Sequence, residues 1–261
     1  MRIRRTTPLI LITIVMVMSS CVSRKKLTYL QYSAESARSD LFADQQASVT
    51  PEAYKVMPYD NLYVRVITPD PQWSSLFNAD VGTAGITQES AALSGYTVDA
   101  QGIIEIPFVG KVPVGGKTLP EIKAELDLIL KNYVTDAAIM VRLVNNYVSI
   151  IGEVRLPGRY MLTKDRITIF DALAIAGDMS DYSNRQKVQL IRPSPYGPIV
   201  KEFSLADRSI LSSEYYYIMP NDIVYAVPRQ SRAFQANSSV WTIFLTTITS
   251  TLGIIAFFRT L

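Results

Sequence analysis

Tyr54–Val64 reads YKVMPYDNLYV, and Tyr216–Ala226 reads YYIMPNDIVYA. A tyrosine, a Met-Pro pair, an aspartate and a second tyrosine fall at the same offsets in both stretches. Each copy predicts strand, turn and strand, because proline presets a turn angle and an aspartate side chain can bond turn amides. The repeat indicates two units with one local architecture. We interpret its prolines and aspartates as structural turn residues rather than catalytic groups. They are Pro58, Asp60, Pro220 and Asp222.

Two helices are predicted between the copies. The first starts at Thr118 and the second at Thr168, each with a carboxylate three residues later in a capping-box pattern. The apolar face of the first helix comprises Leu119, Ile122, Leu126 and Ile129, and that of the second Ile169, Leu173 and Ala176. Strand-like runs at 95–99, 103–109, 138–144 and 147–154 flank the helices, so the expected class is α+β.

The N-terminus follows the grammar of an export signal. Arg2, Arg4 and Arg5 precede the apolar run Pro8–Met18, and Ser19-Ser20-Cys21 follows. This resembles the bacterial lipoprotein signal, with Met18 where leucine is usual. The resemblance implies cleavage after residue 20 and lipid attachment at Cys21. By the same resemblance, the absence of aspartate after the cysteine favours the outer membrane.

Charge and composition exclude several functions. The formal charge of +3 equals the three arginines of the signal, so the cleaved chain is formally neutral and no nucleic-acid partner is expected. The chain has no histidine and one cysteine, which removes histidine-based catalysis, thiolate metal clusters and internal disulfides. We expect no cofactor, no metal and no enzymatic activity, although residue counts alone do not exclude a carboxylate-pair glycosidase.

The uncharged stretch Ser238–Phe258 is long enough for a transmembrane helix. A polar stripe on one helical face holds the pore-lining candidates Thr242, Thr246, Thr249, Ser250 and Gly253. The opposite face holds the lipid-facing candidates Trp241, Phe244, Leu245, Ile248, Leu252 and Ile255. The stripe fits either self-associating helices or a plain single-pass anchor.

In this order, the elements resemble the outer-membrane polysaccharide export proteins, the Wza-like family. The first turn copy, Gly95–Asp99, Gly102–Pro107 and the helix at 118–133 resemble its polysaccharide export domain. Val148–Tyr160, Ile169–Gly177 and Pro220–Tyr225 resemble its SLBB module, a β-grasp unit. The resulting divisions are a signal peptide (1–20), a tether (21–53), a polysaccharide export domain (54–146), one SLBB domain (147–230) and a transmembrane helix (238–258).

The resemblance implies a homo-oligomeric ring that passes capsular polysaccharide or exopolysaccharide through a barrel of C-terminal helices. The folded domains would lie mainly in the periplasm of a Gram-negative bacterium, anchored to outer-membrane lipid. The implied protein partner is an inner-membrane chain-length regulator, often with a tyrosine kinase. The alternative is a lipid-anchored periplasmic glycan-binding module whose C-terminal helix is only an anchor.

Overall fold

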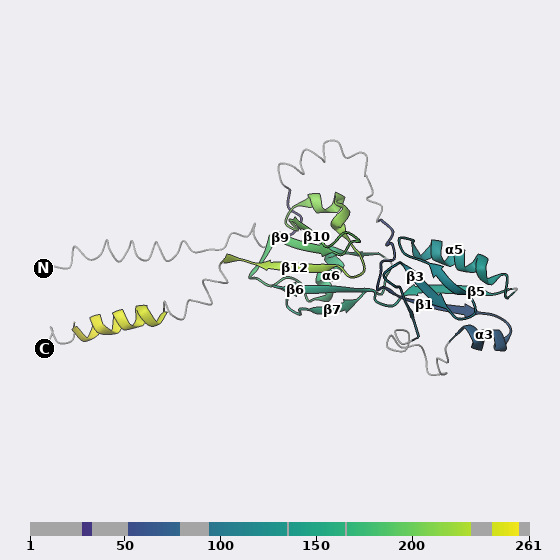
Figure 1. The fold of residues 1–261 in the computed structure, drawn as a ribbon. Coiled ribbons are helices and arrows are strands. Elements are labelled where there is room, and N and C mark those ends of the chain that lie inside the picture. Colours follow the sequence, from purple (N-terminus) through teal and green to yellow (C-terminus); the bar gives the residue numbers. More distant parts are fainter. Residues whose placement is uncertain are drawn as a thin grey trace.

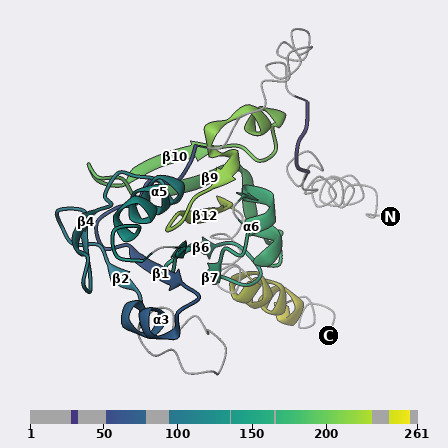
Figure 2. The same cartoon turned by 90° about the vertical axis from the view of Figure 1, so that its right-hand side faces the viewer.

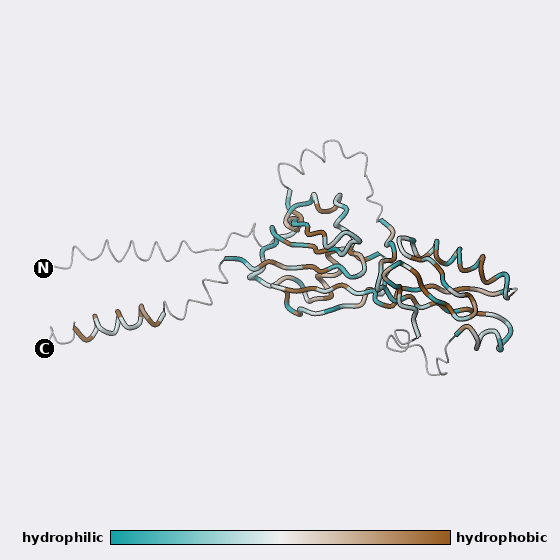
Figure 3. Tube along the Cα trace, in the orientation of Figure 1, coloured by the Kyte–Doolittle hydropathy of each residue, from teal (hydrophilic) through white to brown (hydrophobic). Residues whose placement is uncertain are grey.

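The computed structural model describes residues 28–32, 52–78, 94–134, 136–164, 166–230 and 242–255. Residues 52–144 form a first lobe and residues 145–230 a second lobe, which lie next to each other along the length of the molecule (Figure 1). Each lobe combines strands with helices, as expected for the α+β class. Apolar residues are concentrated inside both lobes (Figure 3). The expected signal peptide, Cys21 and Trp241 lie outside the described residues.

The first lobe is built on a three-stranded antiparallel sheet with the order β2-β1-β5. A separate hairpin, β3–β4, lies next to β2, and helix α5 packs on β5. Ile122, Leu126 and Leu130 of α5 are buried in the core of the first lobe, together with apolar residues of the sheet and the hairpin. The elements are β1 (Asn61–Ile67), α3 (Pro71–Phe77), β2 (Tyr96–Thr97), β3 (Ile103–Ile106), β4 (Gly110–Pro113), α5 (Leu119–Leu130) and β5 (Ala138–Leu143).

The second lobe holds a five-stranded sheet with the order β10-β9-β12-β6-β7. β12 runs parallel to β6 and antiparallel to β9, and α6 packs on β6. Ile169, Leu173 and Ala176 are buried under the sheet, as predicted. The elements are β6 (Tyr147–Gly152), β7 (Gly158–Met161), β8 (Ile167–Thr168), α6 (Ile169–Ile175), β9 (Ser183–Arg192), β10 (Ile199–Phe203), η3 (Arg208–Ser212), η4 (Glu214–Tyr216), β11 (Tyr217–Ile218) and β12 (Ile223–Pro228).

Residues 28–32 lie against the second lobe, although the first lobe follows them in the sequence. The Leu30 amide donates to the Leu205 carbonyl at 3.1 Å, and Gln31 forms a parallel bridge with Asp207. The Tyr29 ring packs edge-on against Phe170 with centroids 5.9 Å apart. The sequence predicts only a tether here, whereas this part of it is a docked segment.

The C-terminal helix is described over residues 242–255, and every one of these residues is exposed (yellow in Figure 2). No helix in the described ranges is both long enough and apolar enough to span a membrane. The predicted span 238–258 therefore gains no support from the structure, and its two ends, 238–241 and 256–258, lie outside the described residues.

Candidate functional site

The two copies of the repeat form two turns of the same geometry. In each, the aspartate amide donates to the carbonyl three residues earlier at 3.2 Å. The aspartate carboxylate in turn accepts a hydrogen bond from the amide of Met57, at 2.9 Å, or of Met219, at 2.8 Å. Both carboxylates thus close their own turns, which is the role that the sequence predicts for Asp60 and Asp222.

The first turn is also the point at which three parts of the chain meet. Asp60 is 3% exposed, and its Oδ2 accepts a hydrogen bond from the Tyr54 hydroxyl at 2.7 Å. Its Oδ1 accepts from Asn145 Nδ2 at 2.9 Å and from Asn221 Nδ2 at 3.5 Å. Asn145 begins the second lobe and Asn221 belongs to the second turn, so Asp60 joins the two lobes. We call the two turns and these contacts between the lobes the junction.

The partners of Asp60 hold its environment fixed. Asn145 Oδ1 accepts a hydrogen bond from the Asn61 amide at 3.1 Å, so both ends of this side chain are bonded. Burial raises the pKa of Tyr54, and the neighbouring Asp60 raises it further. The Tyr54 hydroxyl therefore stays protonated at neutral pH and remains a donor to Asp60.

Asp222 closes the second turn through a different partner. It is fully buried and pairs with Arg192, whose Nε and Nη2 lie 3.0 and 2.8 Å from the two carboxylate oxygens. Arg192 Nη2 also donates to the Tyr217 carbonyl at 3.0 Å. Burial raises the pKa of Asp222, and Arg192 opposes that rise. The two turns are therefore alike in backbone but not in electrostatics.

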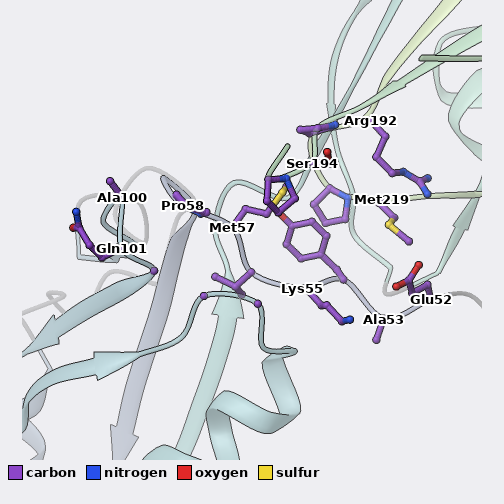
Figure 4. Close-up of a pocket in the computed structure, with 18 residues that line it drawn as sticks. Glu52, Ala53, Lys55, Met57, Pro58, Ala100, Gln101, Arg192, Ser194 and Met219 are labelled. Atoms are coloured by element: carbon purple, nitrogen blue, oxygen red, sulfur yellow. The ribbon is translucent and has the colours of Figure 1, made fainter. Parts of the chain in front are cut away.

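A groove of about 450 Å³ opens beside the two turns, with side chains from both lobes in its walls (Figure 4). Met57 and Pro58 come from the first turn, and Met219 and Pro220 come from the second. A second groove of about 550 Å³ shares Tyr54, Met219 and Pro220 with the first. The walls combine aliphatic and proline side chains with charged ones, and both turn carboxylates are already bonded within the protein. The charged residues are Glu52, Lys55, Lys164, Arg166 and Arg192.

The described residues contain no cluster of three or more histidine, cysteine, aspartate or glutamate side chains that could hold a metal ion. The capping carboxylates Glu121 and Asp171 bond Thr118 and Thr168. The acidic groups for which the sequence suggests a role are thus occupied in turns and caps.

The pore-lining candidates lie on the C-terminal helix, at a distance in sequence from the junction. Two of their hydroxyls donate to the helix's own backbone: Thr246 to the Thr242 carbonyl at 2.7 Å and Thr249 to the Leu245 carbonyl at 2.9 Å. The lipid-facing candidates that the structure describes are 40–60% exposed. They are Phe244, Leu245, Ile248, Leu252 and Ile255.

Sequence reasoning missed several residues at both places. On the helix, Thr247 and Thr251 also bond backbone carbonyls, so hydroxyls occur outside the predicted stripe. At the junction, Tyr54 lies in the repeat and Asn145 stands between two predicted strands, but neither signals a side-chain contact. Arg192, at the end of a strand, carries no sequence signal for its pairing with a turn 30 residues later.

Comparisons with known proteins find similarity to one family model and to several polysaccharide export proteins. Residues 48–144 match the model of a family described as polysaccharide biosynthesis/export protein. The EPS I polysaccharide export outer membrane protein EpsA of Ralstonia nicotianae is 26% identical over 162 residues, covering 57% of this chain and 42% of EpsA. The exopolysaccharide production protein ExoF of Rhizobium meliloti is 29% identical over 177 residues, covering 65% of this chain and 36% of ExoF.

The capsule polysaccharide export outer membrane protein CtrA of Neisseria meningitidis serogroup A is 29% identical over 135 residues, covering 51% of this chain and 34% of CtrA. The chain thus spans well under half the length of these relatives. The family match covers the whole first lobe, including the first repeated turn. The first lobe is thus similar to the family of polysaccharide biosynthesis/export proteins, and the relatives that resemble this chain are named for polysaccharide export or exopolysaccharide production.

Proposed function

We propose that this chain is a non-catalytic subunit of an oligomeric outer-membrane channel that exports capsular polysaccharide or exopolysaccharide. The observation that carries the proposal is the family match over the first lobe, together with relatives named as polysaccharide export outer membrane proteins. The bonded carboxylates at the junction and the helix caps support a structural rather than a catalytic role for these acids.

We infer that residues 147–230 of the second lobe form the SLBB module. The support is its topology: the hairpin β6–β7 leads through helix α6 to β9, and the last strand, β12, lies between β9 and β6 and parallel to β6. A hairpin, a helix and a returning parallel strand are the parts of a β-grasp unit.

The same proposal places the second lobe next to the outer membrane. Thr28, at the start of the docked segment, is seven residues after the proposed lipid site at Cys21, which allows a reach of about 25 Å. The C-terminal helix also follows the last strand of the second lobe. Two membrane attachments on one lobe support folded domains that face the periplasm.

In the proposed channel, the helices from 238–258 of identical subunits form a ring around the polymer. Thr246 and Thr249 donate their hydroxyl hydrogens within the helix while their oxygens can accept from water. Because these hydroxyls are bonded within their own helix, they can face a water-filled lumen or a neighbouring helix without leaving an unpaired donor. The family resemblance adds an inner-membrane chain-length regulator or tyrosine kinase as a partner on the periplasmic side.

The proposal is tested by replacing Thr246, Thr249 and Ser250 with leucine in the bacterium that makes this protein. A conduit should lose polysaccharide export while the protein stays in the outer-membrane fraction. The matched control replaces Thr247 and Thr251 with leucine. These residues lie outside the predicted stripe, so this variant should keep export. Normal export by the first variant would instead favour a glycan-binding module with a plain anchor.

A further inference from the structure

The tip of the β3–β4 hairpin holds an aromatic residue in a strained backbone conformation. Phe108 has a φ of 66°, and the Val109 amide donates to the Ile106 carbonyl at 3.2 Å. With Pro107 in the second position, this is a turn whose third position favours glycine or asparagine. A bulky residue there is a steric outlier that the turn itself does not require.

The second repeated turn provides an internal comparison. Asn221 follows Pro220 and has the same φ of 66°. Asparagine tolerates this conformation because its short polar side chain bonds locally. The first repeated turn, however, places another aromatic residue, Tyr59 with a φ of 69°, at this position. What distinguishes Phe108 is therefore the contact that its ring makes with other aromatic rings.

The Phe108 ring extends a row of aromatic side chains. Its centroid lies 6.0 Å from that of Phe77, edge to face, and Phe77 stacks on Trp73 at 6.2 Å with an interplanar angle of 19°. Phe77 is buried, whereas Phe108 is 65% and Trp73 39% exposed. We name Trp73, Phe77 and Phe108 the aromatic platform.

The size and chemistry of the platform suit a small flat ligand. Aromatic side chains offer about 150–250 Å² each, so Phe108 and Trp73 each expose roughly 100 Å². Phe108 meets Phe77 at 78° whereas Trp73 is inclined to Phe77 by 19°, so the two exposed rings present two differently oriented faces, each the size of about one sugar ring. A stable protein interface needs about 800 Å² per partner. The C–H face of a sugar ring is flat, apolar and slightly positive, and matches the negative face of an aromatic ring.

The surroundings add groups that sugar hydroxyls can bond. The surface at the tip of the hairpin is shallow and open, and residues 105–110 alone line it. Glu105 is exposed and faces Lys111 across the hairpin. These two opposite residues give the hairpin that carries Phe108 an exposed acceptor and an exposed donor for hydroxyl groups.

We propose that the aromatic platform stacks on sugar rings of the exported polysaccharide as the polymer meets the first lobe. This inference rests on the proposed function. It assigns the strained Phe108 a role in polymer contact, separate from the C-terminal helix.

The test uses the full-length protein in detergent with Trp241→Phe, which leaves Trp73 as the only tryptophan. The probe is a set of short fragments of the surface polysaccharide from the bacterium that makes this protein, titrated while Trp73 fluorescence is recorded. Phe108→Gly should weaken binding about tenfold, as expected for the loss of one stacked ring. Its melting temperature should equal or exceed that of the parent, because glycine suits the turn. Phe108→Tyr should bind like the parent.

Tyr59→Gly is the matched control, because it also removes an exposed aromatic ring that follows a proline at a positive-φ turn position, away from the platform, and it should leave fragment binding unchanged. Equal binding by Phe108→Gly and the parent overturns the proposal. The proposal is also overturned if the Trp73 fluorescence of the parent does not change on addition of the fragments. In that case, loss of export in Phe108→Gly would indicate that the platform contacts a protein instead. These results leave the channel function intact, whereas unchanged export after deletion of the whole gene would refute the channel function itself.

Discussion

At the scale of single residues, Asp60 and Asp222 show how one turn motif serves two purposes. Both carboxylates close a Met-Pro-X-Asp turn. The Asp60 carboxylate also accepts hydrogen bonds from neutral donors in both lobes, whereas the Asp222 carboxylate also accepts from the guanidinium of Arg192. Loss of either acid should therefore have different consequences, although the sequence context is the same.

Asp222→Asn should lower the free energy of unfolding by about 3 kcal/mol, because Arg192 is left largely buried without its counter-charge. Adding Arg192→Met should recover at least half of that loss, since removing both partners removes the unpaired charge. Chemical denaturation of the full-length protein in detergent measures both values. The control Lys201→Met removes a nearby exposed cation and should give no recovery. Recovery by the control would contradict the pairing.

At the scale of elements, the helix caps behave as their sequences predict. Both α5 and α6 begin with a capping box, in which a threonine hydroxyl and an acidic side chain bond each other's backbone amides. The threonine side chain and backbone hold the pKa of Asp171 below its ordinary value of 3.8. This provides a pH signature for one helix end.

Thr168→Ala should reduce the free energy of unfolding by about 1 kcal/mol at neutral pH. Because the folded pKa of Asp171 is lowered, its stabilising contribution is complete above 3.8 and disappears as the pH falls through the lowered value. The difference between wild type and variant should therefore shrink below about pH 4. Paired denaturation curves at pH 7 and pH 3 check this, and an equal difference at both would refute it.

The docked segment is the second element with a direct test. Tyr29 packs edge-on against Phe170, and the centre of its ring lies 4.8 Å from the Arg185 guanidinium carbon, so Tyr29→Ala removes contacts of about 2 kcal/mol in total. The Leu30 and Gln31 amides should then exchange hydrogen about 30-fold faster by mass spectrometry, since 1.4 kcal/mol is about tenfold.

Tyr29→Phe keeps the ring but loses the hydroxyl bond to Asp178, so it should have a smaller effect. Burial and that bond raise the pKa of Tyr29 to about 12, so the hydroxyl is a donor throughout the physiological range. Unchanged exchange in Tyr29→Ala would show that the backbone pairing alone holds the segment.

Much of the element pattern follows from local sequence, and the deviations have physical causes. The inward face of the second helix is as predicted, but in α5 the buried residue of the last turn is Leu130, with Ile129 only partly buried. The choice between adjacent apolar residues depends on how the helix rotates against β5, which no local pattern contains. Likewise, Arg192 and Tyr29 find partners 30 and 149 residues away, and such pairings depend on tertiary topology.

At the scale of the whole molecule, Asn145 contributes two of the hydrogen bonds that join the lobes, because its side chain bonds both Asp60 and the Asn61 amide. Asn145→Ala should leave each lobe folded but widen the range of lobe orientations. Spin labels on cysteines at Leu128 and Tyr196, which are 67% and 101% exposed, would report a broader distance distribution. Asn184→Ala, a change within the second lobe, should not alter it. An unchanged distribution in Asn145→Ala would assign the joint to other contacts.

The path of the chain through the second lobe also has a mechanical meaning. The chain docks there at residues 28–32, passes through the first lobe, and leaves again after β12. A pull applied between Thr28 and the C-terminal helix is therefore carried by the second lobe, where the segment grips Leu205 and Asp207. The first lobe bears no tension until that grip fails. In a single-molecule pulling experiment, the docked segment should detach first and at the lowest force, and the two lobes should unfold afterwards. Detachment of the segment would thus release tension before either lobe unfolds.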